Sequence, residues 1–131
     1  QLSTDRARAR VRIAEACWVN PDLVAGPGRL DTLVMQRLPH KVLMKAGAEG
    51  VYAGALPEPG LGFALKIDDG AKRAAEAVAV QLIAGFYPQV GGLGPALALT
   101  NWRGLEVGHM RPAPALAEMR QRLGGLSPSP G

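Results

Sequence analysis

The chain has 131 residues, of which 47% are hydrophobic and 20% are charged, so its composition is that of one globular domain and excludes a wholly disordered chain. The net charge of +4 raises the question of nucleic-acid binding. Much of this charge lies in one short run without interleaved aromatic residues: Arg6, Arg8, Arg10 and Arg12. We interpret the run as a solvated helix face and expect no nucleic-acid partner.

No apolar run approaches the ~20 residues that a membrane-spanning helix needs, so no membrane partner is expected. The single cysteine, Cys17, has no partner for an internal disulfide, which fits a reducing compartment and predicts a cytoplasmic protein. The sequence begins at Gln1 without an initiator methionine, and it resembles the interior of a longer protein.

Two helices are predicted in the first part of the chain. The apolar spacing of Ala7, Val11, Ala14 and Trp18 predicts a helix over 3–18. After a Gly-Pro-Gly turn, either Asp31 or Thr32 is expected to be the N-cap of a short helix that ends near Pro39.

Three strands are predicted next, over 41–46, 50–56 and 61–67, with a loop of hairpin length between the last two. The second and third strands are apolar at nearly every position, which predicts burial on both faces with helices covering the sheet. The expected fold class is α+β, an antiparallel sheet flanked by helices.

The clearest helical periodicity predicts a helix over 71–86. Asp68 and Asp69 precede it and are candidates for its cap or for a role near a catalytic site. A short strand over 105–110 and a helix over 115–123 are expected to follow. We therefore predict a single domain over 1–123 and a flexible tail over 124–131.

The main candidate for catalysis is a Lys-x-Gly step at the end of the first predicted strand. In serine acyl-transferases of the SxxK type, a lysine on an edge strand polarises the region of the nucleophile, and the following glycine lets the substrate approach the backbone. These roles would fall to Lys45 and Gly47, and the N–H of Ala48 would face the developing oxyanion. Ala46 stands where such motifs often have Thr or Ser.

Glu49 has two interpretations. Its carboxylate can orient Lys45 or bind the α-ammonium group of an amino-acid substrate. Alternatively, it forms an internal ion pair with Arg73 or Lys66 that holds the sheet to the helix.

Three long segments of the sequence resemble the bacterial L-asparaginase II family, which is unrelated to the threonine-dependent asparaginases. They read PDLVAGPGRLDTLVM, LMKAGAEGVYAGALPEPGLGFALKIDDGAKRA and NWRGLEVGHMRP, and the resemblance covers most of residues 17–112. It implies hydrolysis of asparagine to aspartate and ammonia on a fold related to serine β-lactamases and glutaminases. This chain would form the C-terminal part of that fold.

The resemblance also implies an SxxK serine–lysine pair and a second serine, and it implies that the lysine of the later Lys-x-Gly strand is Lys45. The two serines match nothing here, because the sequence has no serine from Thr4 to Leu126. The family can bind zinc through its N-terminal half, and Cys17 does not match a ligand, so we expect no cofactor in this chain.

Two functions are therefore considered. In the first, the chain is part of an asparaginase-like amidohydrolase, is inactive alone, and binds a small amino-acid amide together with the missing N-terminal half or a second copy. In the second, it is a non-catalytic α+β module that binds a partner or a small amino acid. Because the apolar strands need more covering helices than the chain supplies, an isolated copy is expected to associate.

Overall fold

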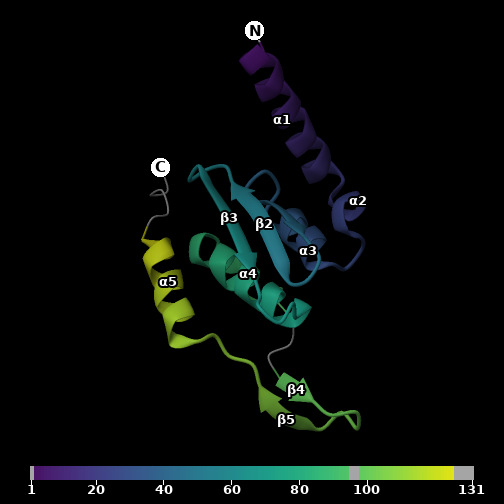
Figure 1. Ribbon diagram of the computed structural model, residues 1–131, viewed down its shortest axis with the longest axis vertical. Helices are drawn as coiled ribbons and strands as arrows, with labels where there is room; N and C mark the ends of the chain where they lie inside the picture. The colour runs from purple at the N-terminus through teal and green to yellow at the C-terminus, as the bar shows by residue number, and fades with distance from the viewer. Residues whose placement is uncertain (1, 95–97, 126–131) are drawn as a thin grey trace.

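A computed structural model describes residues 2–94 and 98–125, and the elements keep the labels of Figure 1. In chain order they are α1 (Leu2–Val19), α2 (Pro21–Ala25), α3 (Leu30–Arg37), β1 (Leu43–Ala46), β2 (Val51–Leu56), β3 (Leu61–Lys66), α4 (Lys72–Phe86), the 3₁₀ helix η1 (Pro88–Val90), β4 (Ala98–Thr100), β5 (Glu106–His109) and α5 (Pro114–Gly124). The predicted α+β class, with antiparallel strands flanked by helices, is confirmed.

The main sheet is antiparallel in the order β1-β2-β3, so β1 is an edge strand. Lys45 lies opposite Ala53, and Ala53 lies opposite Ala64. Ala46 lies opposite Tyr52. Because side chains alternate between the faces of a sheet, Lys45 is on the opposite face from Ala46 and Tyr52.

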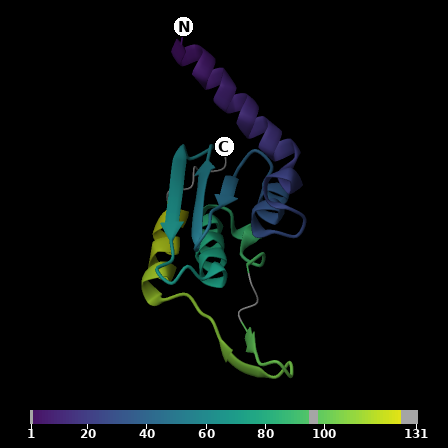
Figure 2. The same ribbon diagram turned by 45° about the vertical axis from the view of Figure 1, so that its right-hand side comes forward.

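The hydrophobic core lies on one face of this sheet, between the sheet and the helices α3 and α4 (Figure 2). The core is made by three parts of the chain, and in each of them the residues are spaced as the element requires: Leu30, Val34 and Leu38 from the α3 segment, Met44, Tyr52 and Leu56 from the strands, and Ala75, Ala79 and Ile83 from α4.

The prediction that β2 and β3 are buried on both faces is wrong. Lys45, Ala53 and Ala64, which form one row across the outer face, are all exposed. The strands read as continuously apolar because most of their outer positions hold alanine or glycine, which are apolar by type but leave little surface to bury. Here α3 and α4 pack against the inner face.

Helix α1 is confirmed, but little of it packs against the rest of the chain (Figure 1). Val11 in the predicted apolar stripe has an exposed fraction of 68%. The C-terminal end is held by Trp18, whose indole N–H donates to the carbonyl oxygen of Val42 at 2.7 Å. The Trp18 ring lies 5.0 Å from that of His40.

The short helix α3 is confirmed, but the prediction that Asp31 or Thr32 caps it is wrong. The helix begins at Leu30 after Arg29, and no side chain caps it. Both predicted caps are buried. The Thr32 hydroxyl lies 2.7 Å from the carbonyl oxygen of Gly26 and 3.2 Å from that of Pro21, so it joins α2 to α3.

The strand predicted over 105–110 is β5, and it pairs with β4, which the sequence pattern did not reveal. This hairpin extends away from the main sheet, and Trp102 at its turn is 93% exposed (Figure 1). The helix predicted over 115–123 is α5, which packs along α4. The predicted tail from residue 126 onward lies outside the described residues. No helix in the described ranges is both long enough and apolar enough to cross a membrane.

Candidate functional site

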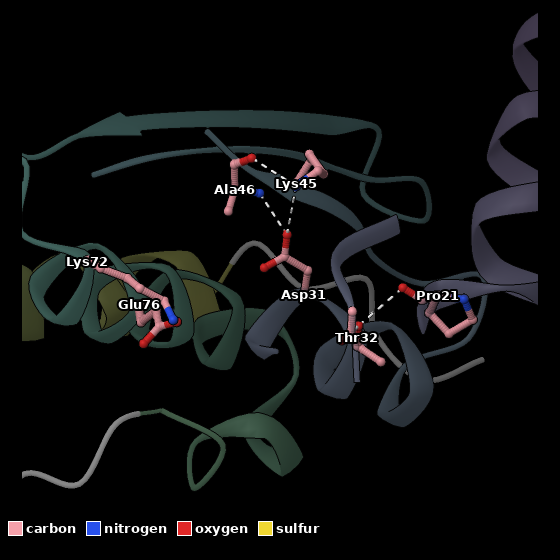
Figure 3. A network of polar contacts seen from close by, with 8 residues as sticks. Pro21, Asp31, Thr32, Lys45, Ala46, Lys72 and Glu76 are labelled. Atoms are coloured by element: carbon pink, nitrogen blue, oxygen red, sulfur yellow. Dashed lines mark hydrogen bonds and ion pairs between the residues drawn. The ribbon is translucent and has the colours of Figure 1, made fainter. Parts of the chain in front are cut away.

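The candidate site lies at the end of the edge strand β1. Lys45 is near the end of this strand, and 58% of its side chain is exposed. Its ammonium group donates to the carbonyl oxygen of the next residue, Ala46, at 3.1 Å. The lysine side chain is therefore folded back along the free edge of the sheet rather than extended into solvent (Figure 3).

A buried carboxylate from α3 reaches the same edge (Figure 3). Oδ2 of Asp31 accepts the backbone N–H of Ala46 at 2.7 Å and lies 3.8 Å from the ammonium nitrogen of Lys45. The side chain of Asp31 is 0% exposed. Asp31, and not Glu49, is thus the carboxylate that contacts Lys45.

The sequence contained a signal for this role that the cap interpretation overlooked. Asp31 shares one face of α3 with Leu30, Val34, Met35 and Leu38, all of which are buried. An acidic residue at a core-facing helical position requires a buried polar partner. That partner is the unpaired backbone of the β1 edge, which only the folded structure identifies.

Gly47 and Ala48 follow the lysine, as the motif requires. The N–H of Gly47 donates to the carbonyl oxygen of Val51 at 2.8 Å, which continues the pairing of β1 with β2. A Cβ atom at position 47 would lie 3.0 Å from that of Val51, so a side chain there would crowd the strand. Ala48 is exposed, and its N–H donates to no group of the described residues.

Glu49 lies in the turn between β1 and β2, where its side chain is exposed and its φ of 57° is in the left-handed region. Within residues 4–94 and 98–125 it forms no ion pair with Arg73 or Lys66, so the predicted structural ion pair is not present. The ammonium group of Lys66 instead donates to the carbonyl oxygen of Ile67.

The turn at Glu49 packs against the turn before α4. Gly50 and Gly70 both have positive φ. A Cβ atom at Gly50 would lie 3.0 Å from the carbonyl carbon of Gly70, and one at Gly70 would lie 3.4 Å from the Cα atom of Glu49. The two acidic turns singled out from the sequence therefore meet at the end of the sheet that carries Lys45.

Asp68 and Asp69 are both exposed within the second of these turns. The carboxylate of Asp69 accepts the N–H of Ala71 at 2.8 Å, and Ala71 is the residue that precedes the first turn of α4. Asp69 therefore stabilises the turn immediately before the helix, but neither it nor Asp68 is the N-cap of α4, which is Ala71 and has no side-chain cap. Neither residue contacts Lys45.

Tyr52 was not predicted as a site residue. It lies on β2, opposite Ala46 of the edge strand β1, and its side chain is on the inner face of the sheet. It is 1% exposed, and its hydroxyl has no hydrogen-bond partner in the described part of the chain; the same holds for Oδ1 of Asp31. Burial is the largest cause that raises the pKa of Tyr52 above its ordinary value, and the negative charges of Asp31 and Glu76 add to it. The hydroxyl therefore stays protonated and remains a donor beside the Asp31 carboxylate.

Zinc, which the family resemblance implies, does not fit the residues of this chain. Cys17 is partly buried on α1, and no group of three His, Cys, Asp or Glu residues in the described ranges is arranged to hold a metal ion. A structural or catalytic zinc site requires three or four such ligands. We therefore derive no step of the chemistry through a metal.

These features define an α+β protein with a candidate site at the free edge of its sheet, where a lysine, a glycine turn and an exposed backbone donor follow one another. The sequence matches L-asparaginase II over residues 1–112, and the chain belongs to this family of asparaginase-type amidohydrolases. The resemblance seen in the sequence is thereby confirmed. No curated protein matches the chain.

Proposed function

We propose that this chain supplies one wall of the active site of an amidohydrolase that converts L-asparagine to L-aspartate and ammonia. The observation that carries the proposal is the position of Lys45: it is exposed at a free sheet edge and held there by a buried carboxylate, in a chain of the L-asparaginase II family. A lysine that served only solubility would need no such support.

In the proposed reaction, a serine hydroxyl attacks the side-chain amide carbon of the substrate. The carbon–nitrogen bond breaks, ammonia leaves with the serine proton, and water hydrolyses the acyl-enzyme ester to release aspartate. The serine comes from outside residues 4–126, which contain none. The chain therefore acts together with an N-terminal segment that carries the SxxK pair.

Lys45 contributes positive charge to this reaction. We infer that its ammonium group stabilises the negative charge that develops on the amide oxygen, or relays the proton to the leaving group. The exposed N–H of Ala48 is the proposed oxyanion donor, and it is supported by having no partner in the described residues. Gly47 keeps this part of the backbone accessible to the substrate.

Glu49 is the proposed partner of the substrate's α-ammonium group. Its exposed position in the turn that follows Lys45 supports this role, and the absence of an ion pair within the described residues leaves its carboxylate available. The neighbouring exposed carboxylate of Asp68 would add negative charge to the same end of the sheet. An amino-acid amide is the substrate class that this arrangement favours.

The test is kinetic and uses the full protein, with its serine-bearing segment. Lys45→Ala is expected to lower kcat for asparagine by about 100-fold or more, since donors and charges of this type contribute on that scale. Lys66→Ala is the matched control, because Lys66 is an exposed lysine of the same sheet whose ammonium group contacts only the chain's own backbone. It is expected to stay close to wild type.

Full activity of the Lys45→Ala variant would overturn the role of this lysine. If the full protein binds asparagine or glutamine but hydrolyses neither, the amidohydrolase proposal is wrong, and the protein is a binding module on the same scaffold.

A further inference from the structure

Asp31 is an unusual residue for the core of this chain. Its carboxylate is completely buried, and the lysine 3.8 Å from it has a side chain that is 58% exposed. Burial of a charge costs stability unless the charge is fully paired. One of its oxygens, Oδ1, has no hydrogen-bond partner among the described residues. The contacts of Asp31 within the described residues therefore offset the cost of burying its charge only in part.

The other oxygen of Asp31 holds two parts of the candidate site. Oδ2 accepts the backbone N–H of Ala46. The N–H of Gly47 donates to β2, so the N–H of the preceding residue, Ala46, points away from β2 and toward Asp31. Oδ2 also attracts the ammonium group of Lys45, which in turn donates to the Ala46 carbonyl oxygen. These contacts fix both the lysine head group and the backbone of the strand edge (Figure 3).

Tyr52 completes this arrangement from below. It pairs with Ala46 across the β1–β2 ladder, so both side chains point to the inner face, toward α3. The negative charge of Asp31 acts on the Tyr52 hydroxyl. The Tyr52 hydroxyl is a buried donor and Oδ1 of Asp31 a buried acceptor, and neither has a hydrogen-bond partner in the described residues, so the two groups are chemically complementary.

We infer that Asp31 is a positioning residue, which acts through Lys45 and the Ala46 N–H to hold the site wall in its reactive geometry. This inference rests on the proposed function. Asp31 does not itself reach the substrate, because its side chain is fully buried. Its charge keeps the Lys45 ammonium group next to the strand edge. Without this attraction, the lysine side chain would sample many rotamers.

The first test is a kinetic double-mutant cycle in the full protein. Asp31→Asn keeps the shape and an acceptor for the Ala46 N–H but removes the charge that attracts Lys45. We expect kcat to fall about 10- to 100-fold with KM little changed, the range expected for a lost interaction with a charged group. In a Lys45→Ala background the same substitution is expected to cost less than twofold, because the group it positions is absent.

The second test does not depend on activity. In the amide NMR spectrum of the full protein, the Ala46 N–H is expected to resonate downfield and to exchange slowly, because it donates to a buried carboxylate. Asp31→Ala is expected to speed its exchange at least tenfold, whereas Asp31→Asn keeps most of the protection. Glu58→Gln, at an exposed carboxylate in the β2–β3 loop and thus beyond the other end of β2 from Tyr52, is the control and leaves this amide unchanged.

The outcomes separate the two proposals. If Lys45→Ala abolishes hydrolysis while Asp31→Asn leaves kcat unchanged, the positioning role is wrong and the proposed function stands. An Asp31→Asn loss of equal size with and without Lys45 would also overturn it. If the full protein hydrolyses no amide, the proposed function fails, and the Ala46 amide still decides whether Asp31 holds the strand edge.

Discussion

Asp31 on α3 and Ala46 on β1 are separated by 15 positions in the sequence and joined by a hydrogen bond of 2.7 Å between carboxylate and backbone N–H. One edge of β1 pairs with β2, and this contact attaches its other edge to a helix. It also leaves a buried charge next to a largely exposed lysine. Such an arrangement makes stability and activity respond differently to the same substitution.

For Asp31→Asn, we expect the free energy of unfolding to stay the same or rise by about 1 kcal/mol, even though activity falls. The asparagine keeps an acceptor for Ala46 and supplies a donor to the Tyr52 hydroxyl, while the buried charge is lost. Asp31→Ala leaves the Ala46 N–H unpaired, and this variant is expected to have a free energy of unfolding that is lower by about 1–3 kcal/mol. Urea unfolding of the three proteins measures both differences, and a large loss for Asp31→Asn would contradict the argument.

The two tyrosines predict a pH dependence of stability. Burial, followed by a hydrogen bond to Glu58, raises the pKa of Tyr87 to about 12, and the pKa of Tyr52 is raised further. A pKa that is raised in the folded state gives stability that is complete below the unfolded value near 10 and is lost as the pH rises through the folded value. The free energy of unfolding is therefore expected to fall from pH 10 toward pH 12.

Ultraviolet absorbance at the phenolate band measures this directly. Because the chain has only 2 tyrosines, the folded protein should show almost no phenolate near pH 10, and the unfolded protein should titrate there. Tyr87→Phe is expected to reduce the loss of stability above that pH. Phenolate absorbance that rises near pH 10 in the folded state would show that the tyrosines are not protected.

The packing of Phe63 over Gly54 predicts a strong effect of a single methyl group. A Cβ atom at Gly54 would lie 2.5 Å from the Phe63 ring and 2.6 Å from the Leu43 carbonyl oxygen. Gly54→Ala is expected to lower the free energy of unfolding by about 2–3 kcal/mol.

Gly62→Ala is the matched control on the neighbouring strand, since its Cβ atom would meet nothing closer than 3.6 Å. Its effect is expected to stay below about 1 kcal/mol. Equal losses for the two variants in thermal or urea unfolding would show that the sheet lacks the close contact at Gly54.

The 2 tryptophans of the chain are expected to report on two different environments. Trp18 is partly buried and hydrogen-bonded, whereas Trp102 is 93% exposed. The Trp102→Phe variant, which emits from Trp18 alone, should emit at shorter wavelength and resist quenching by iodide. Trp18→Phe should do the opposite and should also loosen the end of α1, visible as faster amide exchange near Val19. Similar quenching of both variants would contradict the anchoring of α1 by Trp18.

An isolated copy of the chain is expected to associate, as the sequence predicted, through the face of the apolar strands that is left exposed. The open outer face carries Ala53 and Ala64 in adjacent strands, and β1 and β3 both have free edges. Ala64→Lys is expected to weaken association in sedimentation measurements, while Ala117→Lys on exposed α5 serves as the control. A monomeric wild-type chain at high concentration would contradict this expectation.

The elements with strong periodicity or turn signals were predictable from the sequence. The helix over 72–86 and the hairpin around residues 57–60 appear within a residue or two of their predicted bounds. The open outer face was not predictable from apolar composition, because alanine and glycine count as apolar whether buried or exposed. The pairing of β4 was missed because a strand of three residues, Ala98–Thr100, has too short a pattern to recognise.

The candidate site was only half predictable. The Lys-x-Gly step locates Lys45 and its glycine turn from sequence alone, because both depend on consecutive residues. The role of Asp31 depends on a contact between a helix and a strand edge, and the local signal for a helix cap, an acidic residue after a glycine turn, pointed elsewhere. Glu49 was placed beside Lys45 by its proximity in the chain, whereas the folded turn directs it to solvent.

The bond between Asp31 and Ala46 also constrains how this gene can change in length. Successive backbone N–H groups of a strand point to opposite edges, so an insertion or deletion that shifted β1 by one position against β2 would turn the Ala46 donor toward β2 and put a neighbouring side chain in place of Lys45. Insertions should instead accumulate in exposed turns such as 57–60. The spacing from aspartate to lysine is thus a character by which related genes that keep this site wall can be separated from those that have lost it.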